Sequence, residues 1–135
     1  MVDAIGIFVN IELQLFILLL LAFSSYMAHS KKVQLHCSLM GIALFLQVLT
    51  IFFVMSPSLS SVSGIQISNQ LFLELWVHHI TGLLVLLLVL YINLAVKGYV
   101  RFLGEPYRLM KPVALLWFVV FLGGIHIYTR LYSGL

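Results

Sequence analysis

The chain has 135 residues, of which 63% are hydrophobic and only 8% are charged. A water-soluble globule of this size needs many more polar side chains to cover its surface. The composition therefore excludes a water-soluble globule and predicts an integral membrane protein. The formal net charge of +3 comes from residues in short turns beside apolar runs. We therefore expect contact with the lipid bilayer and its anionic headgroups, and no nucleic-acid partner.

Four apolar runs exceed the roughly 18 to 20 residues that a helix needs to cross a hydrocarbon core about 30 Å thick. They cover residues 4–28, 35–55, 71–96 and 112–132. Strands of a membrane barrel would alternate polar and apolar residues, whereas residues 83–91 read LLVLLLVLY without a break. The sequence thus predicts an all-α membrane protein with a single domain, a four-transmembrane-helix bundle.

Six of the seven basic residues lie in two turn regions on one side of the predicted membrane. They are Lys31, Lys32, Lys97, Arg101, Arg108 and Lys111. Only Arg130 lies on the other side. The positive-inside rule therefore places both turn regions in the cytoplasm and both termini outside, an N-out/C-out topology in the cell membrane.

The connection between the second and third runs, residues 56–70, reads SPSLSSVSGIQISNQ. Its Ser, Pro and Gly content predicts a short external loop. Trp76 and Trp117 lie near predicted helix ends, which is typical of interfacial anchors. The single Cys37 excludes an internal disulfide.

Polar residues inside the apolar runs are costly in lipid, so they are the positions at which to search for function. At a rise of about 1.5 Å per residue, one residue from each helix falls roughly 10 Å below the predicted outer surface. These residues are Glu12, Gln47, His79 and His126, with Gln47 slightly deeper than the rest. Glu74 and His78 are one helical turn apart and share a face. The sequence predicts one polar layer across the bundle.

Converging imidazoles and carboxylates are how helical bundles build metal sites. His79 and His126, supported by His78, Glu74 or Glu12, therefore predict a copper or zinc site near the outer face. Two histidines at equal depth are also the pattern of bis-His haem b, with space left by Gly82, Gly123 and Gly124. A third interpretation is that these side chains only hydrogen-bond between helices or relay protons.

Three segments resemble the CtaM-like (YozB-like) family of small membrane proteins associated with haem-copper oxidases. They are KKVQLHCSLMGIALF with His36, VHHITGL with His79, and WFVVFLGGIHIYTRLY with Trp117, Gly124 and Tyr128. The family's histidines at the outer end of the second helix and in the second basic turn are replaced here by residues 55–58 and 106–107. His126 falls at a position that is aliphatic in the family.

The resemblance implies a role in the assembly or composition of a haem-copper oxidase, with larger membrane subunits of an oxidoreductase complex as partners. We expect an accessory or assembly subunit of a terminal oxidase of the respiratory chain or of a copper monooxygenase. The alternatives are a small b-type cytochrome and a purely structural subunit. No Ser or Cys nucleophile is paired with a base, so we expect no catalytic residue and no enzyme acting alone.

Overall fold

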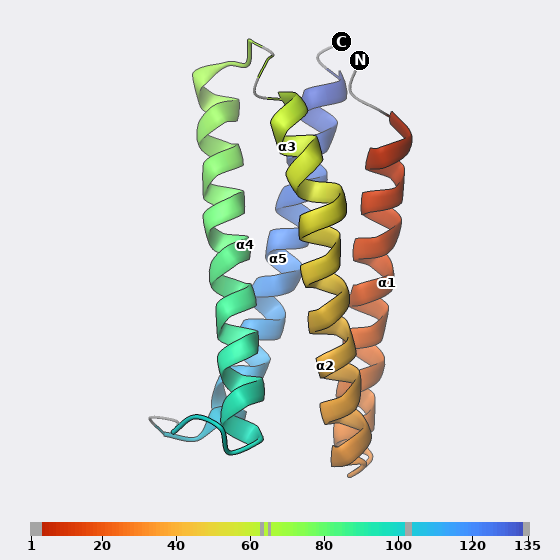
Figure 1. The fold of residues 1–135 in the computed structure, drawn as a ribbon, viewed down its shortest axis with the longest axis vertical. Coiled ribbons are helices and arrows are strands. Elements are labelled where there is room, and N and C mark those ends of the chain that lie inside the picture. Colours follow the sequence, from red (N-terminus) through yellow and green to blue (C-terminus); the bar gives the residue numbers. More distant parts are fainter. Residues whose placement is uncertain (1–3, 63, 65, 102–103, 134–135) are drawn as a thin grey trace. The chain divides into compact units, whose positions relative to one another are not determined.

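Two helical hairpins make up the described part of the chain in the computed structural model, which covers residues 4–62, 64, 66–101 and 104–133 (Figure 1). The first compact unit, Met1–Gln66, contains α1 (Ala4–His29), α2 (Val33–Thr50), the π-helical turn η1 (Ile51–Met55) and α3 (Ser56–Val62). The second unit, Ile67–Leu135, contains α4 (Asn69–Val96) and α5 (Pro106–Ser133). All secondary structure in the described residues is helical, which confirms the predicted class.

Four helical segments are long and apolar enough to cross a membrane. They are Phe8–His29, Val33–Met55, Asn69–Val96 and Pro106–Leu131. In lipid every backbone polar group must be satisfied within the protein, and a continuous helix does this within one segment. The predicted number of helices long and apolar enough to span a membrane is confirmed in the described residues. The N-out/C-out orientation and the packing of the two hairpins into one bundle stay predictions.

The predicted loop at residues 56–70 begins later than expected. The second membrane helix passes through η1 and continues as α3 to Val62, so that one helical rod runs on past Met55 (Figure 1). Ile51 and Ser56 both keep right-handed helical backbone angles. Pro57 lies inside this continuous rod, so its missing N–H leaves a carbonyl of the preceding turn without the usual helical donor, and the π-helical turn η1 comes directly before it. The Ser-rich composition therefore does not stop the helix.

The last helix starts six residues earlier than predicted, at Pro106 instead of Pro112. Both prolines suit the first position of a helix, because the ring fixes φ near the helical value. Just before Pro106, the Glu105 carboxylate binds Arg108 Nε at 3.0 Å. An acidic group there favours the positive end of the helix dipole. Pro112 consequently lies inside α5 and leaves one backbone carbonyl of the first turns without its usual donor.

Both hairpin turns begin with the same helix-ending motif. At the end of α1, Lys31 takes a left-handed φ of 60° and Lys32 N–H donates to Met27 O over 2.9 Å. At the end of α4, Gly98 takes a φ of +79° and Tyr99 N–H donates to Leu94 O over 2.9 Å. These bonds satisfy carbonyls that the helix ends leave free, and they set the basic residues directly at the turns.

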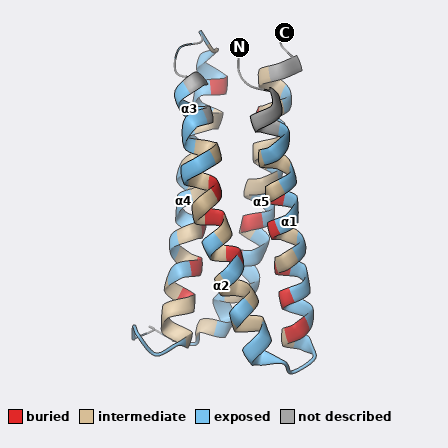
Figure 2. Cartoon of the chain, turned by 45° about the vertical axis from the view of Figure 1, so that its right-hand side comes forward, coloured by how far each residue is buried: buried red, intermediate tan, exposed pale blue. Residues whose placement is uncertain are grey.

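Each hairpin has its own narrow core of buried side chains, most of which lie three or four residues from the next buried residue of the same helix (Figure 2). In the first hairpin these are Gln14, Ile17, Leu21, Ser24, Met27, Ala43, Gln47 and Thr50. In the second they are Leu71, Val85, Val89, Ile92, Val113, Trp117 and Ile127. The spacing is the contact stripe of one helix against another. Trp117 is buried, so its prediction as an interfacial anchor is wrong, whereas Trp76 is exposed.

Candidate functional site: the polar cluster of the α4–α5 hairpin

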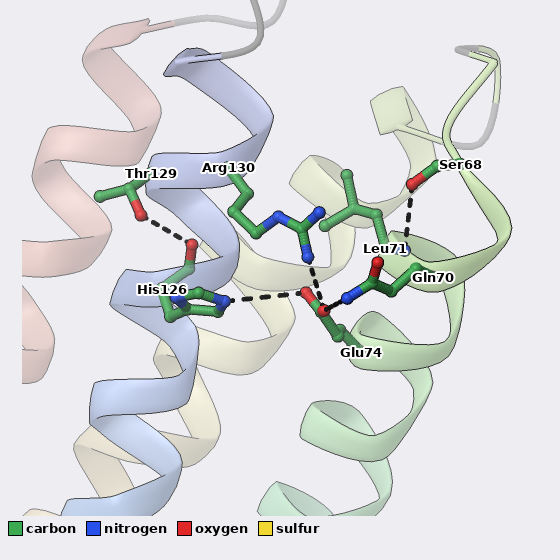
Figure 3. A network of polar contacts seen from close by, with 7 residues as sticks. All are labelled: Ser68, Gln70, Leu71, Glu74, His126, Thr129 and Arg130. Atoms are coloured by element: carbon green, nitrogen blue, oxygen red, sulfur yellow. Dashed lines mark hydrogen bonds and ion pairs between the residues drawn. The ribbon is translucent and has the colours of Figure 1, made fainter.

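Glu74 of α4 lies at the centre of a polar cluster between the two helices of the second hairpin (Figure 3). Arg130 Nη1 of α5 donates to Glu74 Oε1 over 2.6 Å, and Gln70 Nε2 donates to the same oxygen over 3.1 Å. The second oxygen, Oε2, lies 3.9 Å from His126 Nε2. The Glu74 side chain is 26% exposed and that of Arg130 is 37% exposed. The carboxylate is therefore surrounded by donors from both helices.

Helical spacing explains why these side chains meet. Gln70 and Glu74 are four residues apart on α4, and His126 and Arg130 are four residues apart on α5, so each pair shares one face. Ser68 fixes the start of α4, because its hydroxyl accepts the Leu71 N–H over 3.3 Å (Figure 3). This cap satisfies one of the free N–H groups of the first turn and holds the helix regular up to the cluster.

The cluster contains a charge-assisted hydrogen bond between two helices, the Glu74–Arg130 pair, hereafter the clamp. An Arg side chain keeps its charge in proteins, and its bond to a carboxylate is shorter and stronger than a neutral hydrogen bond. Within an apolar span each charge alone would be costly, and pairing offsets much of that cost. Because Oε1 already accepts from two donors, only Oε2 remains open toward His126.

His78 lies one turn below Glu74 and fills a notch in α5. A Cβ at Gly124 would lie 3.1 Å from His78 Cε1, and one at Gly123 would lie 3.7 Å from Nδ1. The absence of side chains at these glycines thus lets the imidazole pack against the α5 backbone. A Cβ at Gly82 would lie 3.6 Å from Val120 Cγ1. Side chains of this hairpin thus lie next to all three glycines that the haem interpretation needs as free space.

His79 points its ring toward its own helix. His79 Nδ1–H donates to Leu75 O over 2.7 Å, which leaves Nε2 as the ring nitrogen that is not bonded to its own helix. Metal-binding histidines usually have their other nitrogen tied in this way. His79 makes no hydrogen bond, ion pair or ring contact with His126 in the described part of the hairpin. Its ring neighbour is His78, edge-on with centroids 5.5 Å apart.

Glu12 belongs to the first hairpin, on α1, where its side chain is exposed. No group of three or more His, Cys, Asp or Glu residues with the arrangement of a metal site occurs among the residues that the structure describes. Of the five predicted metal ligands, the structure brings Glu74 and His126 together. His78 lies one helical turn from Glu74 on α4. His79 and Glu12 make no hydrogen bond or ion pair with Glu74 or His126 among the described residues.

Arg130 and Gln70 belong to the cluster but are absent from the predicted ligand set. In the sequence Arg130 stands out only as the one basic residue outside the two turn regions. A signal was present, because Glu74 and Arg130 are an acidic and a basic residue near the same end of consecutive membrane helices. Opposite charges in apolar runs pair with one another more often than they stay alone.

A second polar layer, in the first hairpin, includes two amides that sequence reasoning also missed. Asn10 and Gln14 of α1 lie one turn apart, and Gln14 and Gln47 are 9% and 8% exposed. Asn10 Oδ1, Gln14 Nε2 and Gln47 Oε1 are all buried without a hydrogen-bond partner in the described chain. Two acceptors and one donor are thus buried in the same half of the hairpin.

Near the other end of this hairpin, Ser24 and His36 join α1 to α2 by reciprocal bonds. Ser24 Oγ–H donates to His36 O over 3.1 Å, and His36 Nδ1–H donates to Ser24 O over 2.9 Å. Ser24 is completely buried. These contacts fix which residues of α1 and α2 lie at the same level, close to the basic turn.

Comparison of the chain with protein-family models, with curated proteins and with solved structures gives no match.

Proposed function

We propose that this chain is a non-catalytic accessory or assembly subunit of a membrane-bound copper or haem oxidoreductase complex, a terminal oxidase or a copper monooxygenase. The observation that carries the proposal is that two ionisable side chains within the spans are exposed on the surface of their hairpins. Glu12 is exposed on α1, and the His126 side chain is 64% exposed on α5. Such groups are costly against lipid. A protein surface that covers them accounts for their presence.

The type of complex follows from the three sequence segments that resemble the CtaM-like family. Two of these segments form the surroundings of the polar cluster, because VHHITGL contains His78 and the closing segment contains Gly124, His126 and Arg130. The fit of His78 against Gly124 gives this part of the resemblance a physical basis, since a Cβ at position 124 would lie only 3.1 Å from His78 Cε1. The resemblance supports a partner that handles haem or copper.

Metal binding is a separate part of the proposal, and the fit is partial. His126 Nε2 and Glu74 Oε2 are two candidate ligand atoms 3.9 Å apart, and the bond of His79 Nδ1 to Leu75 O leaves His79 Nε2 as a further candidate on α4. Copper and zinc both accept imidazole nitrogen and carboxylate oxygen. The Arg130 guanidinium, however, is bonded to the same carboxylate and repels a cation. A metal held here would take the remaining ligands from a partner subunit.

A purely structural subunit is the second candidate, and the clamp itself favours it. Arg130 and Gln70 occupy Glu74 Oε1, and His78 fills the glycine notch, so the polar residues already have packing roles. The two candidates differ in one measurement. Metal analysis of the purified complex should show copper or zinc that is lost in a His79→Ala/His126→Ala double variant if the site binds metal. A structural subunit would show an unchanged metal content.

Identification of the neighbours tests the main proposal. The tagged chain would be extracted from native membranes in a mild detergent, and co-purifying subunits would be identified by mass spectrometry. We expect stoichiometric larger subunits with haem or copper, visible in a reduced-minus-oxidised spectrum. A haem b signal from the isolated chain would instead support the small cytochrome. Recovery of the chain alone, with no oxidoreductase subunit, would contradict the proposal.

A further inference from the structure

One side of α1 carries an unbroken stripe of large exposed side chains that includes a carboxylate. Its members are Phe8, Glu12, Leu15, Leu19, Phe23 and Tyr26, hereafter the Glu12 stripe. Steps of three and four residues keep them on one face of the helix. The buried residues Gln14, Ile17, Leu21 and Ser24 lie on the opposite face, against α2. The Glu12 stripe is therefore turned away from its own hairpin.

Glu12 lies inside the apolar span and not at its edge. Ser24 and His36 are in contact, and antiparallel helices rise equally, so Glu12 is level with Val48, twelve residues along each helix. Beyond Val48 the apolar sequence continues to Met55. Seven residues at about 1.5 Å each place Glu12 roughly 10 Å from that end of the apolar run. At such a depth a carboxylate needs a polar or cationic partner.

The chain offers no cation of its own for this carboxylate. Glu12 takes part in no hydrogen bond or ion pair within the described residues. Six of the seven basic residues lie in or next to the two hairpin turns, and Glu12 lies toward the opposite end of α1 from its turn. The seventh, Arg130, is bonded to Glu74 at 2.6 Å. The described residues thus show no Lys or Arg available to pair with Glu12 at its depth.

We propose that the Glu12 stripe is the surface by which this chain docks on a larger membrane subunit, through a transmembrane helix that presents a Lys or Arg side chain at the depth of Glu12. The proposal rests on the proposed function, since it needs a larger complex. Charge complementarity supplies orientation and specificity, because a desolvated carboxylate rejects a helix that lacks the cation. The apolar members of the stripe supply the packing area.

Site-specific photo-crosslinking in the native complex tests this surface. A photoreactive amino acid would replace Leu19 on the stripe or, as the matched control, Phe45, which is exposed on α2. We expect Leu19 to crosslink to a larger subunit, with the crosslinked peptide lying in a membrane helix that contains Lys or Arg. The Glu12→Lys variant should lower that crosslink about tenfold and leave the Phe45 products unchanged. The isosteric Glu12→Gln should lower it less, and Glu12→Asp least.

The outcomes separate the two proposals. Crosslinks from Leu19 to α4 or α5 of the same chain, to a second copy, or to lipid alone would overturn the docking surface while leaving co-purification intact. An unchanged crosslink in folded Glu12→Lys and Glu12→Gln variants would overturn it as well. If no larger subunit co-purifies with the unaltered chain, the proposed function fails and the docking surface fails with it. Monodisperse elution and helical circular dichroism establish that each variant folds.

Discussion

The Arg130 guanidinium donates to the Glu74 carboxylate over 2.6 Å, so the one basic residue outside the turn regions is paired with an acidic residue of the neighbouring helix. The pair joins α4 to α5 near the ends that lie away from their connection. At the connection itself the chain ties the helices covalently, and between the two points buried Val85 and Trp117 supply packing. The clamp thus joins the ends of α4 and α5 that are farthest from the covalent connection between these two helices.

Breaking this pair from one side should destabilise the second hairpin more than removing both partners. An exposed ion pair contributes up to about 1 kcal/mol, and loss of one partner of a buried pair costs about 3 to 5 kcal/mol. For the half-buried Glu74 and Arg130 we expect Glu74→Ala or Arg130→Ala to cost an intermediate amount. The measurement is SDS-induced unfolding in mixed micelles, followed by circular dichroism.

The double variant Glu74→Ala/Arg130→Ala is the control, because it leaves no unpaired charge. Its loss should be smaller than the sum of the two single losses. If the double variant loses as much stability as the two single variants together, the 2.6 Å contact contributes nothing to stability.

The glycine notch gives a graded prediction. Alanine is the better helix former by roughly 0.8 to 1 kcal/mol, whereas overpacking costs about 1 to 3 kcal/mol. Gly41→Ala, with nothing within 4 Å, and Gly123→Ala, with an ordinary contact at 3.7 Å, should stabilise, whereas Gly124→Ala, with His78 at 3.1 Å, should destabilise. His78→Ala should rescue Gly124→Ala. Equal effects of the Gly41→Ala and Gly124→Ala substitutions, measured by the same unfolding assay, would show that His78 does not limit the size of the residue at position 124.

The buried amides of the first hairpin predict stabilising substitutions. Gln14 Nε2 and Gln47 Oε1 are buried without a hydrogen-bond partner in the described residues, and an unsatisfied buried polar group costs about 1 to 3 kcal/mol. Gln14→Leu and Gln47→Leu should therefore each keep or raise the stability of the first hairpin, and the double variant should be at least as stable as either single variant. Unfolding of the three variants checks this. A loss of stability in either single variant would show that its amide contributes to the folded hairpin.

The positive-inside prediction is tested by thiol labelling. In a Cys37→Ser background, Ser30→Cys places a thiol in the first basic turn and Gln66→Cys places one in the connection after α3, both at exposed positions. A membrane-impermeant maleimide added to intact cells should label Gln66→Cys and leave Ser30→Cys unlabelled until the membrane is opened. Labelling of Ser30→Cys in intact cells would reverse the orientation.

Hydropathy was sufficient to predict the four spans, because apolar length alone decides whether a helix can cross a bilayer. The ends were harder. Both Pro106 and Pro112 carry the signal of a helix start, and only the contact of Glu105 with Arg108 shows that the earlier one is used. The continuation through η1 into α3 was missed because a segment rich in Ser and Pro, such as residues 56–61, is also typical of a loop.

The site was predicted in its residue types and missed in its pairing. Counting depth along separate helices cannot reveal which faces meet, so His79 and His126 were paired where the structure pairs Glu74 with Arg130 and His78 with Gly124. Relative rotation is set by small contacts, here a glycine that admits one imidazole. Amides such as Gln14 carry no charge and little hydropathy signal, so their burial appears only in the folded hairpin.

The most direct test of the central claim is the amount of assembled oxidoreductase in native membranes with and without this chain. Blue-native electrophoresis and a reduced-minus-oxidised spectrum would be recorded for the deletion, for the deletion with the chain restored, and for the deletion carrying Glu12→Lys. An accessory or assembly subunit predicts loss of the complex and of its haem signal on deletion, recovery on restoration, and partial recovery with the variant. Unchanged complex and spectrum in the deletion would contradict it.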